Sequence, residues 1–234
     1  MENFNYYCNL FESDKGDAFW NSNQYSHFYE PYFSSIRDTA TDICEIGVHK
    51  GSSLKAYEAY FSNAKIIGLD IDDKSQYNSE RIKTIICDQS QNESLDKFVE
   101  YCQSKSILFD FILDDGSHDV SHQQLSFGKL FQLIKPGGFY IIEDLCASHF
   151  VLGQELYGYI TSEDKKKNNT HTFLVNRPFK SPWISETNLK YLEDNVDYIS
   201  TFDRWNRNWN APFKCDNNYP ARSITSVVKK TYKK

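Results

Sequence analysis

The chain of 234 residues contains no apolar stretch that approaches the roughly 20 residues needed to span a membrane. Its first residues, MENFNYYCNLF, lack a charged segment followed by an apolar one, so we expect no signal peptide. The net charge is −6 and no stripe of basic residues is present, which argues against a nucleic-acid partner. These absences favour a globular protein without a membrane span.

The six cysteines form no C-x-x-C pair. Cys44 and Cys87 lie in apolar runs that are typical of strands, and Cys102 lies in a helical pattern. We therefore expect buried, reduced thiols and a cytoplasmic location.

Apolar runs alternate with helical patterns through the middle of the chain. The helical patterns SSLKAYEAYF, NESLDKFVEYCQS and SHQQLSFGKLFQLI separate the apolar runs. This alternation predicts an α/β protein with a doubly wound, mostly parallel sheet, whose ligands bind at the carboxyl ends of the strands. The expected strands are TDICEIG (41–47), AKIIGLDID (64–72), IKTIICDQS (82–90), FDFILDD (109–115) and KPGGFYIIEDL (135–145).

The two ends of the chain are less regular. Residues 1–40 predict an aromatic cap segment with a helix interrupted at Pro31, and residues 41–234 predict one domain whose acceptor-binding region follows residue 150. In that region we expect helices over 152–160 and 187–199, a Trp-rich loop over 202–213 and a last strand over 222–232.

A glycine turn follows the first expected strand, in EIGVHKGSS. Its spacing matches neither G-x-G-x-x-G nor a P-loop, which leaves a turn suited to a nucleoside ligand without phosphates. Asp70, at the end of the second strand, is placed to accept hydrogen bonds from two ribose hydroxyls, and Asp88 and Gln89 are placed to bracket a base. Each of these residues alone is more often a turn residue or a helix cap than a ligand contact, and only their combined order favours a nucleoside site.

Five segments, EIGVHKGSSL, IIGLDID, CDQS, DDGSH and LFQLIKPGGFYIIEDL, resemble the class I S-adenosylmethionine-dependent methyltransferases. More narrowly, they resemble the metal-dependent sugar O-methyltransferases of the macrocin and mycinamicin type. The resemblance covers about residues 41–150, with a fainter echo in DKG (14–16) and HFYEPYF (27–33). It implies a Rossmann-like, seven-stranded sheet with the last strand antiparallel. The cofactor contacts that we expect are Glu45, Gly47, Ser52, Asp70, Asp88, Gln89 and Asp114.

Acidic residues end two further strands, in DDGSH and IIEDL. Transfer of a methyl group to a sugar hydroxyl needs that hydroxyl to lose its proton, and a bound Mg²⁺ or another divalent cation helps by lowering its pKa. Oxygen ligands suit Mg²⁺, and the resemblance assigns the metal to Asp115, Glu143 and Asp144.

The same resemblance assigns the general base to His118, one turn past Asp115, whose unperturbed pKa suits that task. His149 is an alternative base, and Asp114 lies nearer the cofactor or supports the turn. The plain alternative is that both motifs are turns or strand ends without a ligand.

The leading interpretation is a cytosolic, Mg²⁺-dependent enzyme that methylates a hydroxyl of a sugar on a nucleotide sugar, a glycan or a glycosylated natural product. Methylation of a catechol-like hydroxyl is the alternative within enzymes, and a non-catalytic nucleoside-binding protein is the alternative outside them. The expected partner is a sugar-containing small molecule or glycan, and a homo-oligomer is left open.

Overall fold

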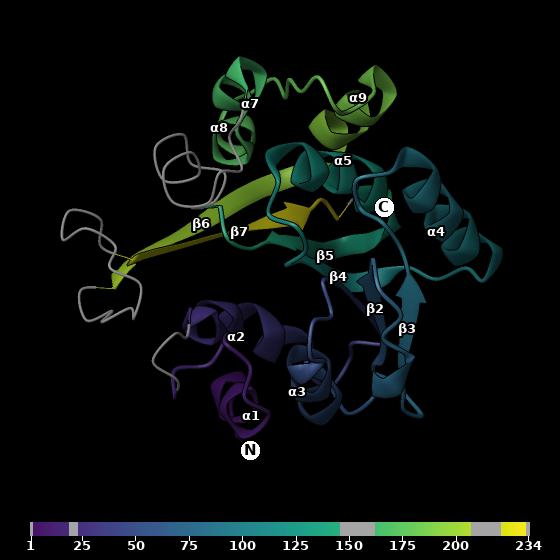
Figure 1. Ribbon diagram of the computed structural model, residues 1–234, viewed down its shortest axis with the longest axis vertical. Coiled ribbons are helices and arrows are strands. Elements are labelled where there is room, and N and C mark those ends of the chain that lie inside the picture. Colours follow the sequence, from purple (N-terminus) through teal and green to yellow (C-terminus); the bar gives the residue numbers. More distant parts are fainter. Residues whose placement is uncertain (1, 19–22, 146–161, 207–220, 233–234) are drawn as a thin grey trace.

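The computed structural model describes residues 2–18, 23–145, 162–206 and 221–232. A seven-stranded sheet forms its centre, with helices on both faces (Figure 1). The strands lie in the order β3-β2-β1-β4-β5-β7-β6, and β7 runs antiparallel to both of its neighbours. The predicted doubly wound sheet with an antiparallel last strand is confirmed. The strands are β1 (Asp42–Ile46), β2 (Lys65–Asp70), β3 (Ile82–Ile86), β4 (Phe109–Asp114), β5 (Ile134–Ile142), β6 (Val196–Asn206) and β7 (Ala221–Lys230).

The order of the parallel strands reverses beside β1, which pairs with β2 on one side and with β4 on the other. Ile46, the last residue of β1, lies opposite Leu69 of β2 and Asp114 of β4. The loops that follow these strands therefore leave the sheet side by side at one edge. A reversal of strand order opens a crevice at that edge, where ligands bind in such folds.

Two layers of helices cover the sheet (Figure 1). The helices of the N-terminal half, α1 (Phe4–Leu10), α2 (Tyr25–Ile36) and α3 (Ser52–Tyr60), cover one face. The other face carries α4 (Asn92–Ser104), α5 (Val120–Leu130) and α9 (Glu186–Asn195). The shorter elements are α7 (Glu163–Lys167), α8 (Thr170–Val175) and the 3₁₀ turns η1 (Ser75–Tyr77) and η2 (Phe131–Leu133). Buried side chains form two core clusters, which matches a sheet covered on both faces.

The expected interruption of a helix at Pro31 is wrong, because α2 runs through this residue. Proline removes one backbone hydrogen bond from a helix. The aromatic side chains of Tyr25, Tyr29 and Phe33, spaced by four residues on the same helix, are fully buried in the core. Burial of large aromatic surfaces outweighs the missing hydrogen bond.

The N-terminal segment shares its core with the sheet. Phe33 of α2 stacks on Phe111 of β4 with ring centroids 4.5 Å apart, and Phe4 of α1 stacks on Tyr57 of α3 at 5.6 Å. A hydrophobic cluster of buried residues joins α1, α2 and α3 to β1, β2 and β4. The division of the chain at residue 40 remains a prediction, although the two parts pack on each other.

Other expectations meet mixed outcomes. The helix expected over 187–199 ends at Asn195, where β6 begins, and the first part of the Trp-rich loop belongs to β6. The helix expected over 152–160, the rest of that loop and His149 lie outside the described residues.

The four described cysteines, Cys8, Cys44, Cys87 and Cys102, are buried and free, as expected. Within the described ranges, no helix is long and apolar enough to cross a membrane.

Candidate active site

The loops after β1 and β4 meet at Gly47. This residue has a backbone φ of 90°, and a Cβ built on it would lie 2.1 Å from the carbonyl oxygen of Asp115. Only glycine tolerates both the left-handed conformation and such a close approach. The glycine turn predicted from the sequence therefore fixes the position of Asp115 by direct contact.

Two cavities flank this contact, and both are lined by Gly47, His49, Asp115 and Gly116. The first, here called the Asp70 cavity, has a volume of about 410 Å³. Its lining includes Asp70, Asp72, Cys87, Asp88, Gln89 and His122. The second, here called the acidic cavity, has a volume of about 400 Å³. Its lining includes Asp14, Lys15, Ser52, His118 and Asp144.

The Asp70 cavity brings together three residues that the sequence analysis assigned to a nucleoside. Asp70, Asp88 and Gln89 come from the ends of β2 and β3, and all three line the cavity. Asp70 Oδ2 accepts hydrogen bonds from the backbone N–H groups of Val48 at 2.9 Å and His49 at 3.2 Å. Asp70 thus also shapes the glycine turn, which no motif in the sequence indicated.

Glu45 and Asp114, both predicted as cofactor contacts, line neither cavity. The Glu45 carboxylate is fully buried and accepts hydrogen bonds from Ser53 Oγ at 2.5 Å and Tyr57 Oη at 3.2 Å. Burial raises its pKa to about 7. Asp114 accepts a hydrogen bond from Ser126 Oγ at 2.6 Å, and burial raises its pKa to about 6. Both side chains brace the strand ends from inside the protein.

The acidic cavity contains a group of side chains that suits a metal ion. One ligand atom from each of Asp115, His118 and Asp144 lies within 4.8 Å of the others. His118 Nε2 is 3.7 Å from Asp144 Oδ2. His118 and Asp144 have backbone φ values of 59° and 52°, a left-handed conformation that non-glycine residues rarely adopt and that is enriched at functional sites. Two carboxylates at this separation fit a divalent cation, and the imidazole beside them is within reach either of that cation or of a hydroxyl bound to it.

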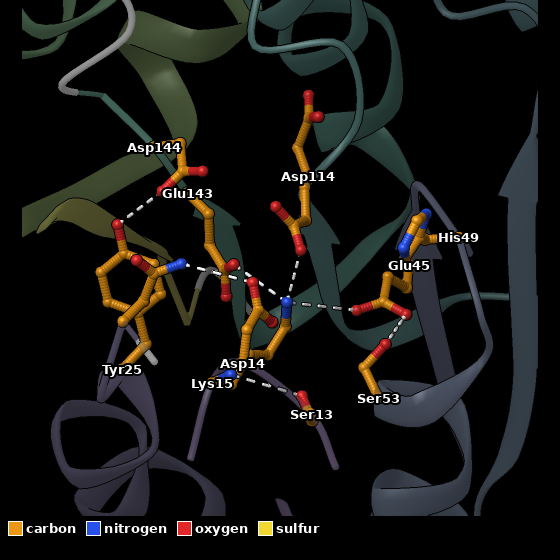
Figure 2. A network of polar contacts seen from close by, with 12 residues as sticks. Ser13, Asp14, Lys15, Tyr25, Glu45, His49, Ser53, Asp114, Glu143 and Asp144 are labelled. Carbon is orange, nitrogen blue, oxygen red and sulfur yellow. Dashed lines mark hydrogen bonds and ion pairs between the residues drawn. The ribbon is translucent and has the colours of Figure 1, made fainter. Parts of the chain in front are cut away.

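Lys15 is the residue of this site that sequence reasoning missed. It comes from the loop between α1 and α2, and its side chain is 1% exposed. Its Nζ lies 2.5 Å from Asp115 Oδ2, 2.9 Å from Glu143 Oε2 and 3.8 Å from Glu45 Oε1 (Figure 2). Burial opposes its charge, but Asp115 and Glu143 outweigh burial and raise the pKa of Lys15 well above its usual value. The only signal in the sequence was the faint resemblance of DKG (14–16).

Glu143 lies behind the acidic cavity. Its carboxylate is fully buried, accepts a hydrogen bond from Tyr29 Oη at 2.8 Å, and pairs with Lys15. Burial raises its pKa well above the usual value despite the adjacent ammonium. Of the three carboxylates predicted to bind a metal, Asp115 and Asp144 therefore face the acidic cavity, and Glu143 adjoins it through Lys15.

Comparison with solved structures identifies the fold. The chain matches the MycE methyltransferase of the mycinamycin biosynthetic pathway, solved with Mg, SAH and mycinamycin VI, with a TM-score of 0.67 and 24% identity. The match covers 98% of this chain and 55% of MycE. The chain has the class I methyltransferase fold. An O-methyltransferase from Bacillus cereus, solved with SAH, matches with a TM-score of 0.51 and 16% identity over 97% of this chain and 90% of its own.

Comparison with curated proteins confirms the narrower resemblance. An 8-demethyl-8-α-L-rhamnosyl tetracenomycin-C 2'-O-methyltransferase from Streptomyces olivaceus is 34% identical over 61% of this chain and 38% of its own length. The mycinamicin VI 2''-O-methyltransferase from Micromonospora griseorubida is 37% identical over 52% of this chain and 31% of its own. The chain thus matches less than half the length of these relatives. No protein-family model matches it.

Proposed function

We propose that the chain is a methyltransferase domain that uses S-adenosylmethionine and a divalent cation to methylate a hydroxyl group of a sugar. The observation that carries this proposal is the meeting of Asp115, His118 and Asp144 in a cavity that adjoins the Asp70 cavity. The arrangement sets a candidate base and candidate cation ligands beside a candidate nucleoside site. The resemblance to sugar O-methyltransferases supports the same reaction.

The Asp70 cavity takes the nucleoside part of the cofactor in this proposal. S-adenosylmethionine supplies an activated methyl group. Asp70 accepts hydrogen bonds from the ribose hydroxyls while it holds the glycine turn, and Asp88 and Gln89 contact the base. Gly47 and Ser52 line the acidic cavity, where the methionine part of the cofactor would extend. Glu45 and Asp114 contribute to the cofactor site indirectly, because their hydrogen bonds hold in place the strand ends from which that site is built.

The acidic cavity would hold the reacting hydroxyl and a divalent cation. When bound there, the cation would supply a Lewis acid that lowers the pKa of the acceptor hydroxyl. Asp115 and Asp144 offer oxygen ligands toward the cavity. Glu143, the third ligand that the resemblance assigns, contacts the same Lys15 ammonium as Asp115. His118 accepts the proton of the hydroxyl, and the carboxylate of Asp144, 3.7 Å away, stabilises the resulting imidazolium.

A sugar is the favoured acceptor because the relatives named above act on sugars of natural products, among them a rhamnosyl group and mycinamicin VI. A catechol-like acceptor remains the alternative, because its two neighbouring hydroxyls could bind a cation as two neighbouring hydroxyls of a sugar do.

The test is transfer of a tritiated methyl group from S-adenosylmethionine to an acceptor in the presence of Mg²⁺. Methyl α-L-rhamnoside, mycinamicin VI and catechol serve as acceptors, and EDTA serves as the control. We expect labelled rhamnoside or glycosylated macrolide that disappears with EDTA. Labelling of catechol alone would show that the acceptor is a catechol-like hydroxyl and would contradict the proposal of a sugar. Binding of S-adenosylhomocysteine by calorimetry without transfer to any acceptor would favour the non-catalytic nucleoside-binding protein.

A further inference from the structure

Lys15 places a positive charge where the carboxylates of the acidic cavity meet. Its ammonium contacts Asp115 and Glu143, and its side chain has almost no exposure to water. The carboxyl group of Glu45 lies 3.8 Å from the same ammonium. Buried carboxylates at this separation repel one another, so a cation is needed among them. Lys15 supplies that charge from within the chain.

The loop that carries Lys15 is built to hold it there. Asn9 Oδ1 accepts hydrogen bonds from the backbone N–H groups of Asp17 at 2.9 Å and Ala18 at 3.0 Å. Asp17 Oδ1 in turn accepts hydrogen bonds from Asn5 and Asn9. A Cβ on Gly16 would lie 2.2 Å from Asn9 Oδ1, so a side chain at this position would have to displace the Asn9 amide that holds the loop. The position of Lys15 is therefore fixed by its own loop as well as by the carboxylates.

Asp115 belongs to two groups at once. Its Oδ2 pairs with Lys15, and the same carboxylate is one of the three side chains that suit a metal ion. An ammonium in contact with a carboxylate partly neutralises its negative charge, so the carboxylate attracts a metal ion less strongly. The ammonium also repels the metal ion directly. This holds with or without Glu143 as a ligand, because Lys15 contacts both.

We propose that Lys15 is a positioning residue that acts as a resident counter-cation: it holds Asp115 and Glu143 in place when no divalent cation is bound and weakens the binding of that cation. This inference rests on the proposed cation-dependent function. It assigns the N-terminal loop a direct influence on the metal affinity of the site. The reacting groups remain those named above.

The test measures Mn²⁺ binding to the full chain by calorimetry and by the electron paramagnetic resonance signal of free Mn²⁺. Lys15→Met removes the charge and keeps the length of the side chain, whereas Lys15→Arg keeps the charge. We expect Lys15→Met to bind Mn²⁺ about ten-fold more tightly than the unsubstituted chain or better, and Lys15→Arg to stay within about three-fold. Lys50→Met, an exposed lysine that lines the same cavity, is the matched control with little expected change.

A second measurement follows thermal unfolding. In EDTA we expect Lys15→Met to unfold at a lower temperature, and saturating Mn²⁺ to raise that temperature more than it does for the unsubstituted chain. If Lys15→Met does not fold, the same comparison is made between Glu143→Gln and the double variant Lys15→Met/Glu143→Gln, in which both charges of the pair are removed. Tighter Mn²⁺ binding by the double variant supports the inference.

The outcomes separate this inference from the proposed function. Equal Mn²⁺ affinity with and without Lys15 would overturn the inference and leave cation-dependent methylation standing. Binding of Mn²⁺ by Lys15→Met but not by the unsubstituted chain would support the inference and overturn the cation-dependent function. Failure of every variant to bind Mn²⁺ would overturn both.

Discussion

Tyr25 donates a hydrogen bond from its phenolic hydroxyl to Asp144 Oδ1 over 2.8 Å, although the two residues are 119 positions apart in the sequence (Figure 2). Tyr25 begins α2 and is fully buried, and Asp144 follows β5 in a left-handed conformation. The hydrogen bond leaves Oδ2 of Asp144 directed at His118. The N-terminal segment thus orients a carboxylate of the candidate cation site.

Replacement of Tyr25 by phenylalanine removes this hydrogen bond and keeps the ring. We expect the free energy of unfolding in EDTA to fall by about 1.5–3 kcal/mol, the usual cost for a hydrogen bond to a charged group. Mg²⁺ should restore part of the loss, because a bound cation stabilises Asp144 by other means. Urea unfolding with and without Mg²⁺ measures both. Tyr32→Phe, a half-buried tyrosine of the same helix, is the control. A loss as small as that of the control would contradict the role given to Tyr25.

Replacement of His118 by alanine removes the proposed base. We expect kcat to fall by about 10²–10⁴-fold, the range for loss of general base catalysis, while the affinity for S-adenosylhomocysteine changes little. Initial rates and calorimetry measure the two quantities. His122→Ala is the matched control, because His122 lines the Asp70 cavity and is hydrogen-bonded to Ser117. Its kcat should remain close to that of the unsubstituted chain. An unchanged kcat at neutral pH for His118→Ala would remove its role as base.

Replacement of Asp70 by alanine removes the expected ribose contact and two hydrogen bonds to the glycine turn. We expect the affinity for S-adenosylhomocysteine to weaken by about 1–3 kcal/mol, which is about 5- to 150-fold. Calorimetry provides the measurement. Asp73→Ala, three residues further along, is the control, since its carboxylate bonds only to nearby Ser75 among the described residues. Equal affinities of the two variants would contradict the nucleoside assignment.

The stability of the chain should depend on pH through Asp17. Hydrogen bonds from Asn5 and Asn9, and an interaction with His27, lower its pKa to about 2, below the value near 3.9 of an unfolded chain. Because the folded-state pKa is the lower one, its contribution is fully present above about pH 4 and is lost as the pH falls toward 2.

We therefore expect the stability difference between the unsubstituted chain and Asp17→Asn to shrink over that acidic range, and to be constant between about pH 5 and pH 7. Urea unfolding at several pH values measures it. Asp38→Asn, at an exposed aspartate of the same segment, is the control for the change of charge alone. A difference that stays constant down to pH 2 would show that the Asp17 contacts do not favour its ionised form.

The fold was predictable because short apolar runs end in glycine or acidic residues at regular intervals. Gly47 and Asp115 follow, and Asp70 ends, a strand that is buried on both faces, and this pattern is typical of parallel sheets. The resemblance assigned Glu45 and Asp114 to the cofactor, and that assignment stays a prediction, although neither side chain lines a cavity. In a strand without polar alternation, the sequence does not say which side chains point toward a cavity and which point into the protein.

Lys15 was not predictable for a different reason. A lysine between aspartate and glycine in a short loop is typical of a solvated turn. Its burial depends on Asp115 and Glu143, which are more than 99 positions away and which local patterns do not connect to it. The pairing of Tyr25 with Asp144 escaped prediction in the same way.

These long-range pairs have a consequence for the order in which the molecule assembles. Lys15 meets Asp115 across 100 positions of chain and Glu143 across 128, and pairs of such separation carry a large loop-closure cost. We expect the acidic cavity to form late in folding, after β4 and β5 have paired. A cation bound there would then slow unfolding and leave the folding rate almost unchanged, because its ligands are not yet together in the transition state.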